Sequence, residues 1–333
     1  MNNIPKRLDQ YDFLKGVAIV FVLLLHSLSR EVLWFMHSNY SIGQAVPLFI
    51  LCTFVLSFNS LFARKRYIKY WFSKNRVHTL FGKIIKPFLI VQFLLIMLLL
   101  LSGNSDKLIN LIKNAGFGPG SYYPWIYLQF WLLIPFLYGL FKNVGILWAG
   151  GIVLIISQML QYACSVLEIS EEIYRLLCFR YVFLSVLAYL VLKYSIKPIW
   201  NILFFLIGVG YYVFLDMGVK FTPWLYNSWM SQQLPAYFYT IVVFSLLTAA
   251  YNRFSENRFI RIFVFLGRYS WEIFLLQMFF ISVISSNRFK IVENEWINSI
   301  FYVLLVFTMS ILPIIGRDYI NKKHLKIEEK NII

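Results

Sequence analysis

Ten long apolar runs divide the chain, and they constrain its fold more than any other feature. They cover residues 12–29, 43–62, 84–102, 124–141, 144–163, 177–194, 199–215, 235–251, 268–286 and 297–316. An α-helix needs about 20 mainly apolar residues to cross the hydrocarbon of a bilayer. The runs are continuous, whereas the strands of a membrane barrel are short and alternate in polarity. The sequence therefore predicts an all-α polytopic membrane protein with about ten transmembrane helices.

Composition supports a lipid environment for the whole chain. Of 333 residues, 60% are hydrophobic and only 14% are charged, whereas a soluble domain is about half apolar and a quarter charged. The interior of a domain this long cannot hold the excess. The stretches between the apolar runs have the length of loops, so we expect a single membrane domain over residues 1–333.

The net charge of +16 is unevenly distributed along the chain. If the N-terminus is cytoplasmic, most of the Lys and Arg residues lie on the cytoplasmic side, as positive-inside topology requires. The inner loop after the second run and the start of the third run contain Arg64, Lys65, Arg66, Lys69, Lys74, Arg76, Lys83 and Lys86. We therefore expect both termini in the cytoplasm and no nucleic-acid partner. Topology and contact with anionic lipids are sufficient roles for these basic residues.

Two ionisable residues share one face of the first apolar run. Lys15 and His26 are separated by about three helical turns and a rise of about 16.5 Å. Lys15 would lie at the cytoplasmic mouth and His26 deep in the bilayer, which is about the reach of a phosphopantetheine arm. A positioned imidazole can act as a general base. The alternative is that His26 is a neutral core residue and Lys15 a snorkelling anchor.

Other polar and aromatic groups allow two interpretations each. Asp12 is three residues before Lys15, a spacing that favours a local ion pair, and Glu272 is four residues after Arg268. The aromatic residues of segment 223–234 form either an interfacial belt or a platform for sugar rings. The three cysteines have no metal or redox spacing, so we expect no metal site.

Five segments, in order, resemble motifs of the bacterial acyltransferase-3 family. The first is Lys15-Gly16 followed by an apolar stretch that ends at His26, because the family signature is a basic residue, ten apolar-rich residues and a histidine. The others are Val46-Pro47-Leu48-Phe49, Lys83-Ile-Ile-Lys86-Pro87, Gly118-Pro119-Gly120-Ser121-Tyr122-Tyr123 followed by Gln129 and Pro135, and Leu266-Gly267-Arg268-Tyr269-Ser270 with Ile273-Phe274-Leu275.

The sequence departs from the family pattern at two of these motifs. The closing motif often ends in histidine, whereas this chain has Gln277. Lysines replace common arginines before the third run, and a lysine is a point charge without the bidentate fork of arginine. We expect a stand-alone membrane domain, without the periplasmic domain that is fused to some members.

The resemblance implies a bacterial inner-membrane enzyme that transfers an acyl group, usually acetyl, from cytoplasmic acyl-coenzyme A to a hydroxyl of an envelope carbohydrate. It implies no cofactor beyond this donor. His26 would be the general base, and Glu272 would orient a partner or pair with Lys15. The candidate residues for binding the donor or the acceptor are Lys15, Arg76, Lys83, Lys86, Tyr122, Tyr123, Gln129 and Gln277. A polysaccharide exporter without catalytic activity is the alternative, but no internal repeat indicates a transporter.

Overall fold

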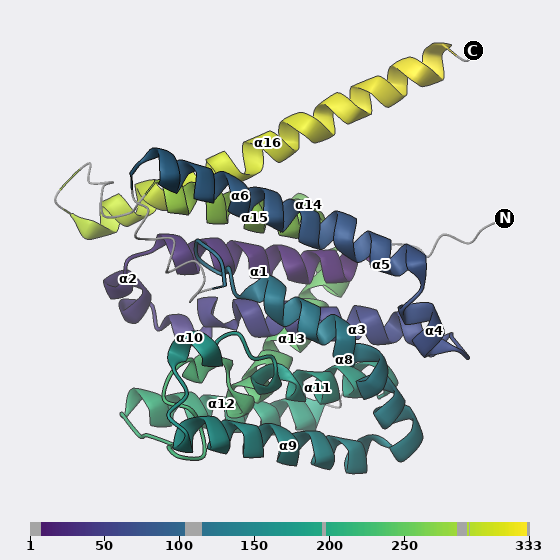
Figure 1. Ribbon diagram of the computed structural model, residues 1–333, viewed down its shortest axis with the longest axis vertical. Helices are drawn as coiled ribbons and strands as arrows, with labels where there is room; N and C mark the ends of the chain where they lie inside the picture. The colour runs from purple at the N-terminus through teal and green to yellow at the C-terminus, as the bar shows by residue number, and fades with distance from the viewer. Residues whose placement is uncertain (1–7, 104–114, 195–197, 285–291, 293, 332–333) are drawn as a thin grey trace.

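The computed structural model describes residues 8–103, 115–194, 198–284, 292 and 294–331, and every regular element in these ranges is helical (Figure 1). The elements are α1 (Asp9–Ser27), α2 (Arg30–Phe35), η1 (Ser38–Tyr40), η2 (Ile42–Gln44), α3 (Ala45–Phe62), α4 (Tyr67–Trp71), α5 (Lys74–Leu80), η3 (Phe81–Ile85), α6 (Lys86–Leu101), α8 (Tyr123–Val144), α9 (Ile146–Val166), α10 (Glu171–Tyr174), η5 (Phe179–Tyr181), α11 (Phe183–Lys193), α12 (Pro198–Asp216), η6 (Met230–Gln232), α13 (Leu234–Phe254), α14 (Arg258–Arg268), α15 (Ser270–Val283) and α16 (Glu295–Asn331). The prediction of an all-α membrane protein is confirmed.

Each of the ten apolar runs contains a helix, but two of these helices are short. Within the described residues, eight helical segments are long and apolar enough to cross a membrane. The sixth run forms only α11, with 11 residues, after the short helix η5. The ninth forms α15, with 14 residues, because a break at Tyr269 separates it from α14. The last two residues of the ninth run, 285 and 286, lie outside the described residues.

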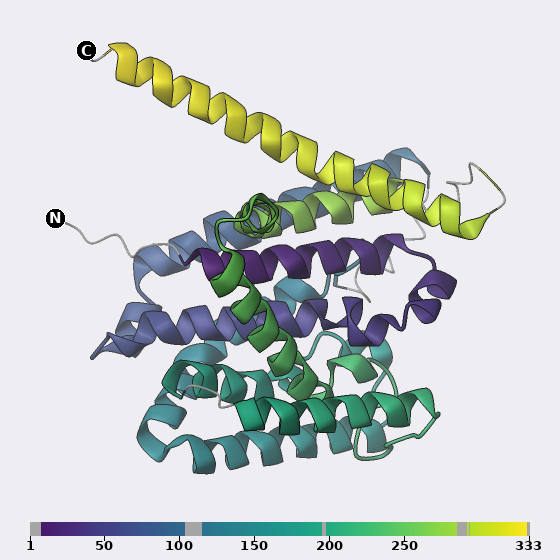
Figure 2. The same cartoon turned by 180° about the vertical axis from the view of Figure 1, so that it is seen from behind.

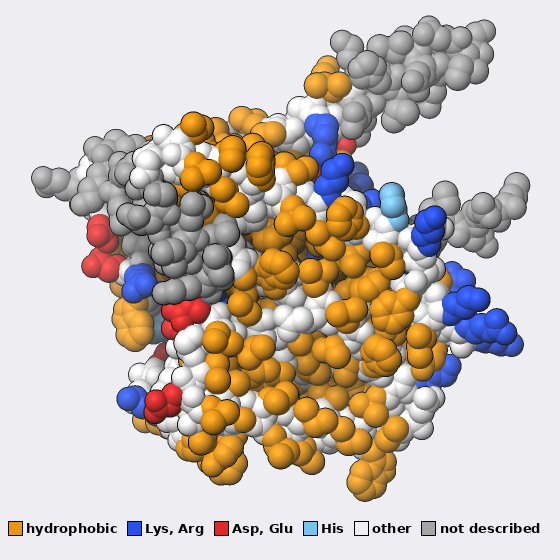
Figure 3. All heavy atoms as spheres, viewed as in Figure 1, with side chains coloured by type: hydrophobic (Ala, Val, Ile, Leu, Met, Phe, Trp, Pro, Cys, Tyr) orange, Lys and Arg blue, Asp and Glu red, His pale blue; other side chains and the backbone are white. Residues whose placement is uncertain are grey.

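Charge divides the helical bundle into two ends. Figures 1 and 2 show that α1 begins and α16 finishes at the same end of the bundle. Lys and Arg side chains gather at this end, and Asp and Glu side chains are seen at the other (Figure 3). We call these the basic end and the opposite end. Apolar side chains cover the surface between them in this view, as expected for a surface that faces lipid.

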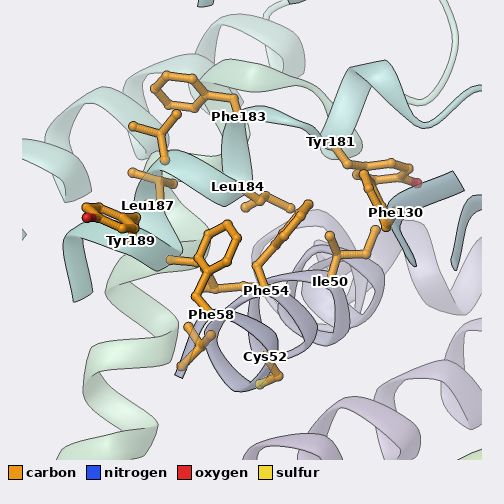
Figure 4. Close-up of a cluster of buried hydrophobic side chains, with 14 of the residues drawn as sticks. Ile50, Cys52, Phe54, Phe58, Phe130, Tyr181, Phe183, Leu184, Leu187 and Tyr189 are labelled. Carbon is orange, nitrogen blue, oxygen red and sulfur yellow. The ribbon is translucent and has the colours of Figure 1, made fainter. Parts of the chain in front are cut away.

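A cluster of buried aromatic residues holds α3, α8 and α11 together. Figure 4 shows Phe54 and Phe58 of α3 beside Leu184, Leu187 and other side chains of the neighbouring helices. The rings of Phe54 and Phe130 meet edge to face with their centroids 4.8 Å apart, a geometry that ring quadrupoles favour. This cluster fixes the positions of α3 and α8, and both helices also contribute side chains to the cavity that contains His26.

Two glycines let α1 and α14 cross in backbone contact. A Cβ atom added to Gly16 would lie 1.9 Å from the carbonyl oxygen of Phe263, and one added to Gly267 would lie 1.6 Å from the carbonyl oxygen of Asp12. Small residues permit such close approach between membrane helices. The crossing places Arg268, at the end of α14, next to the first turns of α1.

Candidate active site

A cavity of about 260 Å³ lies between α1, α3, α8 and α15. Its lining residues are Lys15, Val22 and His26 of α1, Val46, Phe49, Thr53, Leu56 and Ser57 of α3, Ile84 of η3, Gly120 and Tyr122 before α8, Tyr123 and Tyr127 of α8, and Ser270, Trp271 and Phe274 of α15. The wall is therefore mainly apolar and aromatic, with a few polar groups, which is the usual character of a small-molecule site.

The cavity brings together the two ionisable residues of α1 that share a helical face. Lys15 and His26 both line it, as their spacing of three turns predicts. Because α1 begins at the basic end, Lys15 lies nearer that end and His26 lies deeper. The structure therefore directs both side chains toward an interior space, which is where ionisable groups in membrane helices are usually found.

Lys15 belongs to an ion-pair network at the crossing of α1 and α14. Its ammonium nitrogen is 2.8 Å from Oδ1 of Asp12, so the local pair expected from their spacing is present. Oδ2 of Asp12 is 3.8 Å from Nε of Arg268, and a second nitrogen of Arg268 is 2.8 Å from Oδ1 of Asp9. Asp12 thus contacts two cations, and its carboxylate holds the Lys15 side chain at the edge of the cavity.

A glycine-rich turn covers the cavity next to His26. Gly116, Gly118 and Gly120 all have positive φ angles, 139°, 88° and 81°, which glycine adopts without the steric cost of a side chain. A Cβ atom on Gly120 would lie 2.8 Å from the ring of Phe274 and 3.8 Å from Nε2 of His26. The turn therefore lies beside the imidazole, and the ring of Phe274 leaves no room for a side chain at Gly120, whereas Gly118 is packed against Met278 and Ser282.

Tyrosines and hydroxyl residues form the rest of the polar wall. Tyr122 and Tyr123 were candidates from the sequence, and both line the cavity. Sequence reasoning missed Thr53 with Ser57 on α3, and Tyr127 on α8. The signal was available, because Ser57 follows Thr53 by four residues and Tyr127 follows Tyr123 by four, which places each pair on one helical face.

The basic candidates before the third span do not converge on the cavity with Lys15. Lys83 and Lys86 are exposed, and only Ile84 from this segment is part of the lining. The guanidinium of Arg76 packs on the rings of Trp71 and Tyr70, at 4.3 and 4.8 Å from their centroids. Among the residues that line this cavity, Lys15 is the only lysine or arginine.

Glu272 and Gln129 lie outside the cavity lining and have other partners. Glu272 forms an ion pair with Arg317 of α16, so the pair with Arg268 that its spacing favours is wrong. Gln129 donates to the carbonyl oxygen of Leu176 at 2.7 Å and accepts from the backbone N–H of Cys178 at 3.1 Å. These bonds tie α8 to the segment before α11.

Gln277 occupies a different environment from either of them. Its side chain is fully buried, and neither of its polar atoms has a hydrogen-bond partner in the described part of the chain. It lies about one helical turn beyond Phe274, a lining residue, but is not itself part of the lining. Burying an amide without hydrogen-bond partners costs free energy of folding. Gln277 therefore remains a candidate for substrate binding close to the cavity.

Comparison with known proteins identifies the family to which the chain belongs. A family model described as an acyltransferase domain matches residues 8–316. No curated protein and no solved structure matches the chain. The matched range covers nearly all of the chain, from the start of α1 to the membrane part of α16, and includes every residue that lines the cavity. The chain therefore belongs to the acyltransferase-3 family.

Proposed function

We propose that the protein transfers an acyl group, in the simplest case acetyl, from cytoplasmic acyl-coenzyme A to a hydroxyl of a cell-envelope carbohydrate. The observation that carries this proposal is the single cavity lined by both Lys15 and His26. Its volume of about 260 Å³ is below the roughly 300–1,000 Å³ of pockets that enclose a whole drug-sized ligand. The cavity therefore suits the narrow pantetheine arm with its acyl group, while the nucleotide remains outside.

The nucleotide end of the donor has a basic surface available at the same end of the molecule. Residues Arg64, Lys65, Arg66, Lys69 and Lys74 line an open hollow there, with Tyr70 and Phe72 beside them. Clustered cations attract a polyphosphate and raise its local concentration. Lys15 at the cavity edge would then contact a donor phosphate, and Arg76, Lys83 and Lys86 would add to the attraction.

His26 would act on the acceptor hydroxyl at the inner end of the cavity. The hydroxyl oxygen attacks the thioester carbonyl carbon, and the imidazole takes the hydroxyl proton. The carbon–sulfur bond then breaks, and the thiolate receives the proton as the thiol of coenzyme A leaves. His26 lines the cavity, and the hydrogen bonds of the described residues include none to its ring nitrogens, so the imidazole is available to substrate.

The acceptor would approach from the opposite end of the bundle, past the turn that carries Gly120. Tyr122 and Tyr123 line the cavity there, and aromatic rings offer flat apolar surfaces for sugars. With both termini in the cytoplasm, this route faces the envelope side of a bacterial inner membrane. Donor and acceptor would then reach His26 from the two faces of the membrane.

Thiol release from acetyl-coenzyme A by the purified protein, with and without His26, tests the proposal. General-base catalysis contributes about a hundredfold to ten-thousandfold, so His26→Ala and His26→Gln should lower turnover by that factor and leave donor affinity nearly unchanged. His78→Gln is the matched control, because His78 is exposed on α5. Near-normal turnover in a well-folded His26 variant would remove this mechanism and favour an exporter.

A further inference from the structure

Among the residues that the structure describes, one arginine outside the network around Lys15 is fully buried. Arg180, in η5, has 1% of its surface exposed. Among the described residues no carboxylate lies within ion-pair distance of it. Burying a charge without a counter-charge costs several kcal/mol. Such a residue in a membrane protein is a functional candidate by default.

The guanidinium of Arg180 is surrounded by four aromatic rings. Its central carbon is 4.6 Å from the ring centroid of Tyr181, 4.9 Å from Trp229, 5.3 Å from Tyr174 and 5.8 Å from Tyr122. Cation–π contacts compensate part of the cost of burial, but they do not supply hydrogen-bond acceptors for the N–H groups of the guanidinium. Burial raises the pKa of the Tyr174 phenol above its usual value, so this neighbour stays neutral and supplies no counter-charge.

Several hydrogen-bond donors converge at this place without an acceptor. One nitrogen, Nη2 of Arg180, donates to the carbonyl oxygen of Arg175 at 3.2 Å. Nε and Nη1 of Arg180 and Nε1 of Trp229 are buried and have no partner in the described residues. All three are donors, and none can accept a hydrogen bond. A set of this kind matches an oxyanion, because arginine binds carboxylate and phosphate in bidentate fashion.

Tyr122 connects this cluster to the cavity. Its ring lies against that of Trp229, with centroids 5.3 Å apart, and Tyr122 also lines the space that contains His26. Arg180 therefore lies about one aromatic ring behind the cavity wall, next to Tyr174 of α10, a helix that is found toward the opposite end (Figure 1). The segment over it, residues 217–233, has only one short helix, η6, so a ligand gains access if this segment moves while the membrane helices stay in place.

We infer that Arg180, Trp229 and Tyr122 form an acceptor subsite that binds an oxyanion, either a carboxylate or a phosphate, carried by the carbohydrate. This inference rests on the proposed function, since it assigns the acceptor to the side of the cavity that faces away from the donor. The anion fixes one end of the acceptor at Arg180, and its hydroxyl then extends past Tyr122 toward His26. The acceptor is thus an acidic saccharide.

Ligand-observed NMR on the full-length protein in nanodiscs can measure this preference directly. The probes are methyl β-glucuronide, glucose 1-phosphate and the neutral methyl β-glucoside. We expect at least one of the two anionic sugars to bind about 10- to 100-fold more tightly than the neutral sugar, the range for hydrogen bonds to a charged group. Comparison of the two anionic probes identifies carboxylate or phosphate as the preferred group. Equal binding of all three sugars would overturn the inference.

Variants separate this role from a structural one. Arg180→Gln should abolish the preference for the anionic sugar and leave the affinity for acetyl-coenzyme A unchanged, whereas Arg180→Lys should retain part of it. Arg261→Gln is the matched control, because Arg261 is exposed at the basic end and pairs with Glu256. Retention of the full preference in Arg180→Gln would overturn the assignment. If Arg180→Gln does not fold, Arg180→Lys and Trp229→Phe are measured instead. A full preference for the anionic sugar in both variants would overturn the assignment.

Two further outcomes distinguish the ligand and the underlying function. If Arg180→Gln lowers the affinity for succinyl-coenzyme A and leaves sugar binding unchanged, the anion belongs to the acyl group and the acceptor subsite is refuted. If the wild-type protein binds acidic sugars through Arg180 but releases no thiol from any acyl-coenzyme A, the subsite stands and the proposed function fails. If thiol is released but acidic sugars are not preferred, the proposed function stands and the acceptor subsite fails.

Discussion

At the scale of single residues, Lys15 and Asp12 show how one carboxylate serves two cations. The Asp12 side chain is 5% exposed, and it contacts Lys15 at 2.8 Å and Arg268 at 3.8 Å. If Lys15 loses its charge, Arg268 remains as a counter-charge for Asp12, so the local fold does not depend on Lys15 alone. Lys15 can therefore turn from Asp12 to a ligand at the cavity edge without leaving that carboxylate unpaired.

We expect Lys15→Gln to raise the KM for acyl-coenzyme A by about tenfold to a hundredfold, because a hydrogen bond to a charged group is lost. Turnover at saturating donor should change much less. The measurement is steady-state kinetics of thiol release, with thermal unfolding as a check on stability. Lys142→Gln is the control, since Lys142 contacts only the ring of Tyr67 among the interactions described for it. An unchanged KM would reduce Lys15 to a structural ion-pair partner.

At the scale of helices, the crossing of α1 and α14 decides where Asp12, Lys15 and Arg268 meet. Gly16 and Gly267 allow the two backbones to touch. α14 also carries Arg258, Arg261 and Arg268 on one face, among phenylalanines and isoleucines, as amphipathic helices at a membrane surface do. The helix holds the start of α1 in place through these backbone contacts and through the ion pairs of Arg268 with Asp9 and Asp12.

Gly267→Ala should destabilise the protein by about 1–3 kcal/mol, the usual cost of overpacking, because its Cβ atom would lie 1.6 Å from the Asp12 carbonyl oxygen. We also expect weaker donor binding, since α1 and Lys15 must shift. Thermal unfolding in detergent and a donor-binding assay measure the two effects. Gly210→Ala on α12 is the matched control, because nothing lies within 4 Å of its Cβ position. Equal stability of the two variants would contradict a tight crossing.

At the scale of the whole molecule, the basic end acts as a surface of positive potential. Lys83 and Lys86 are exposed and lie outside the cavity lining. Figure 3 shows Lys and Arg side chains along this end in the view of Figure 1. If the proposed function holds, their effect on a charged donor is long-range attraction, which salt screens over about 10 Å at 0.1 M ionic strength.

Lys83→Gln combined with Lys86→Gln should weaken acyl-coenzyme A binding by about threefold to tenfold at low salt, in line with the modest worth of exposed charges, and by less at high salt. The measurement is donor affinity as a function of ionic strength. Arg258→Gln combined with Arg261→Gln removes the same charge from α14 and should have a smaller effect. Equal salt dependence in wild type and the lysine variant would leave these lysines with a topological role only.

The sequence by itself determined the fold class and the family. The apolar runs required lipid as solvent, because no core of this size could bury them, and the distribution of Lys and Arg indicated which end faces the cytoplasm. The shared face of Lys15 and His26 followed from helical periodicity alone, since both belong to one unbroken helix. The fold class and the shared face are confirmed because they depend on local spacing and composition, whereas the cytoplasmic orientation stays a prediction.

Only the tertiary structure decided which residues from different helices meet. Glu272 pairs with Arg317, 45 residues away in the chain, instead of Arg268, and Gln129 turns from the cavity to the segment before α11. In the sequence, Arg180 is a basic residue near the start of the sixth apolar run, and nothing in its local pattern distinguishes it from other basic residues. Its burial among the rings of Tyr122, Tyr174, Tyr181 and Trp229 depends on segments more than 100 residues apart, and no local pattern encodes a contact that packing alone creates.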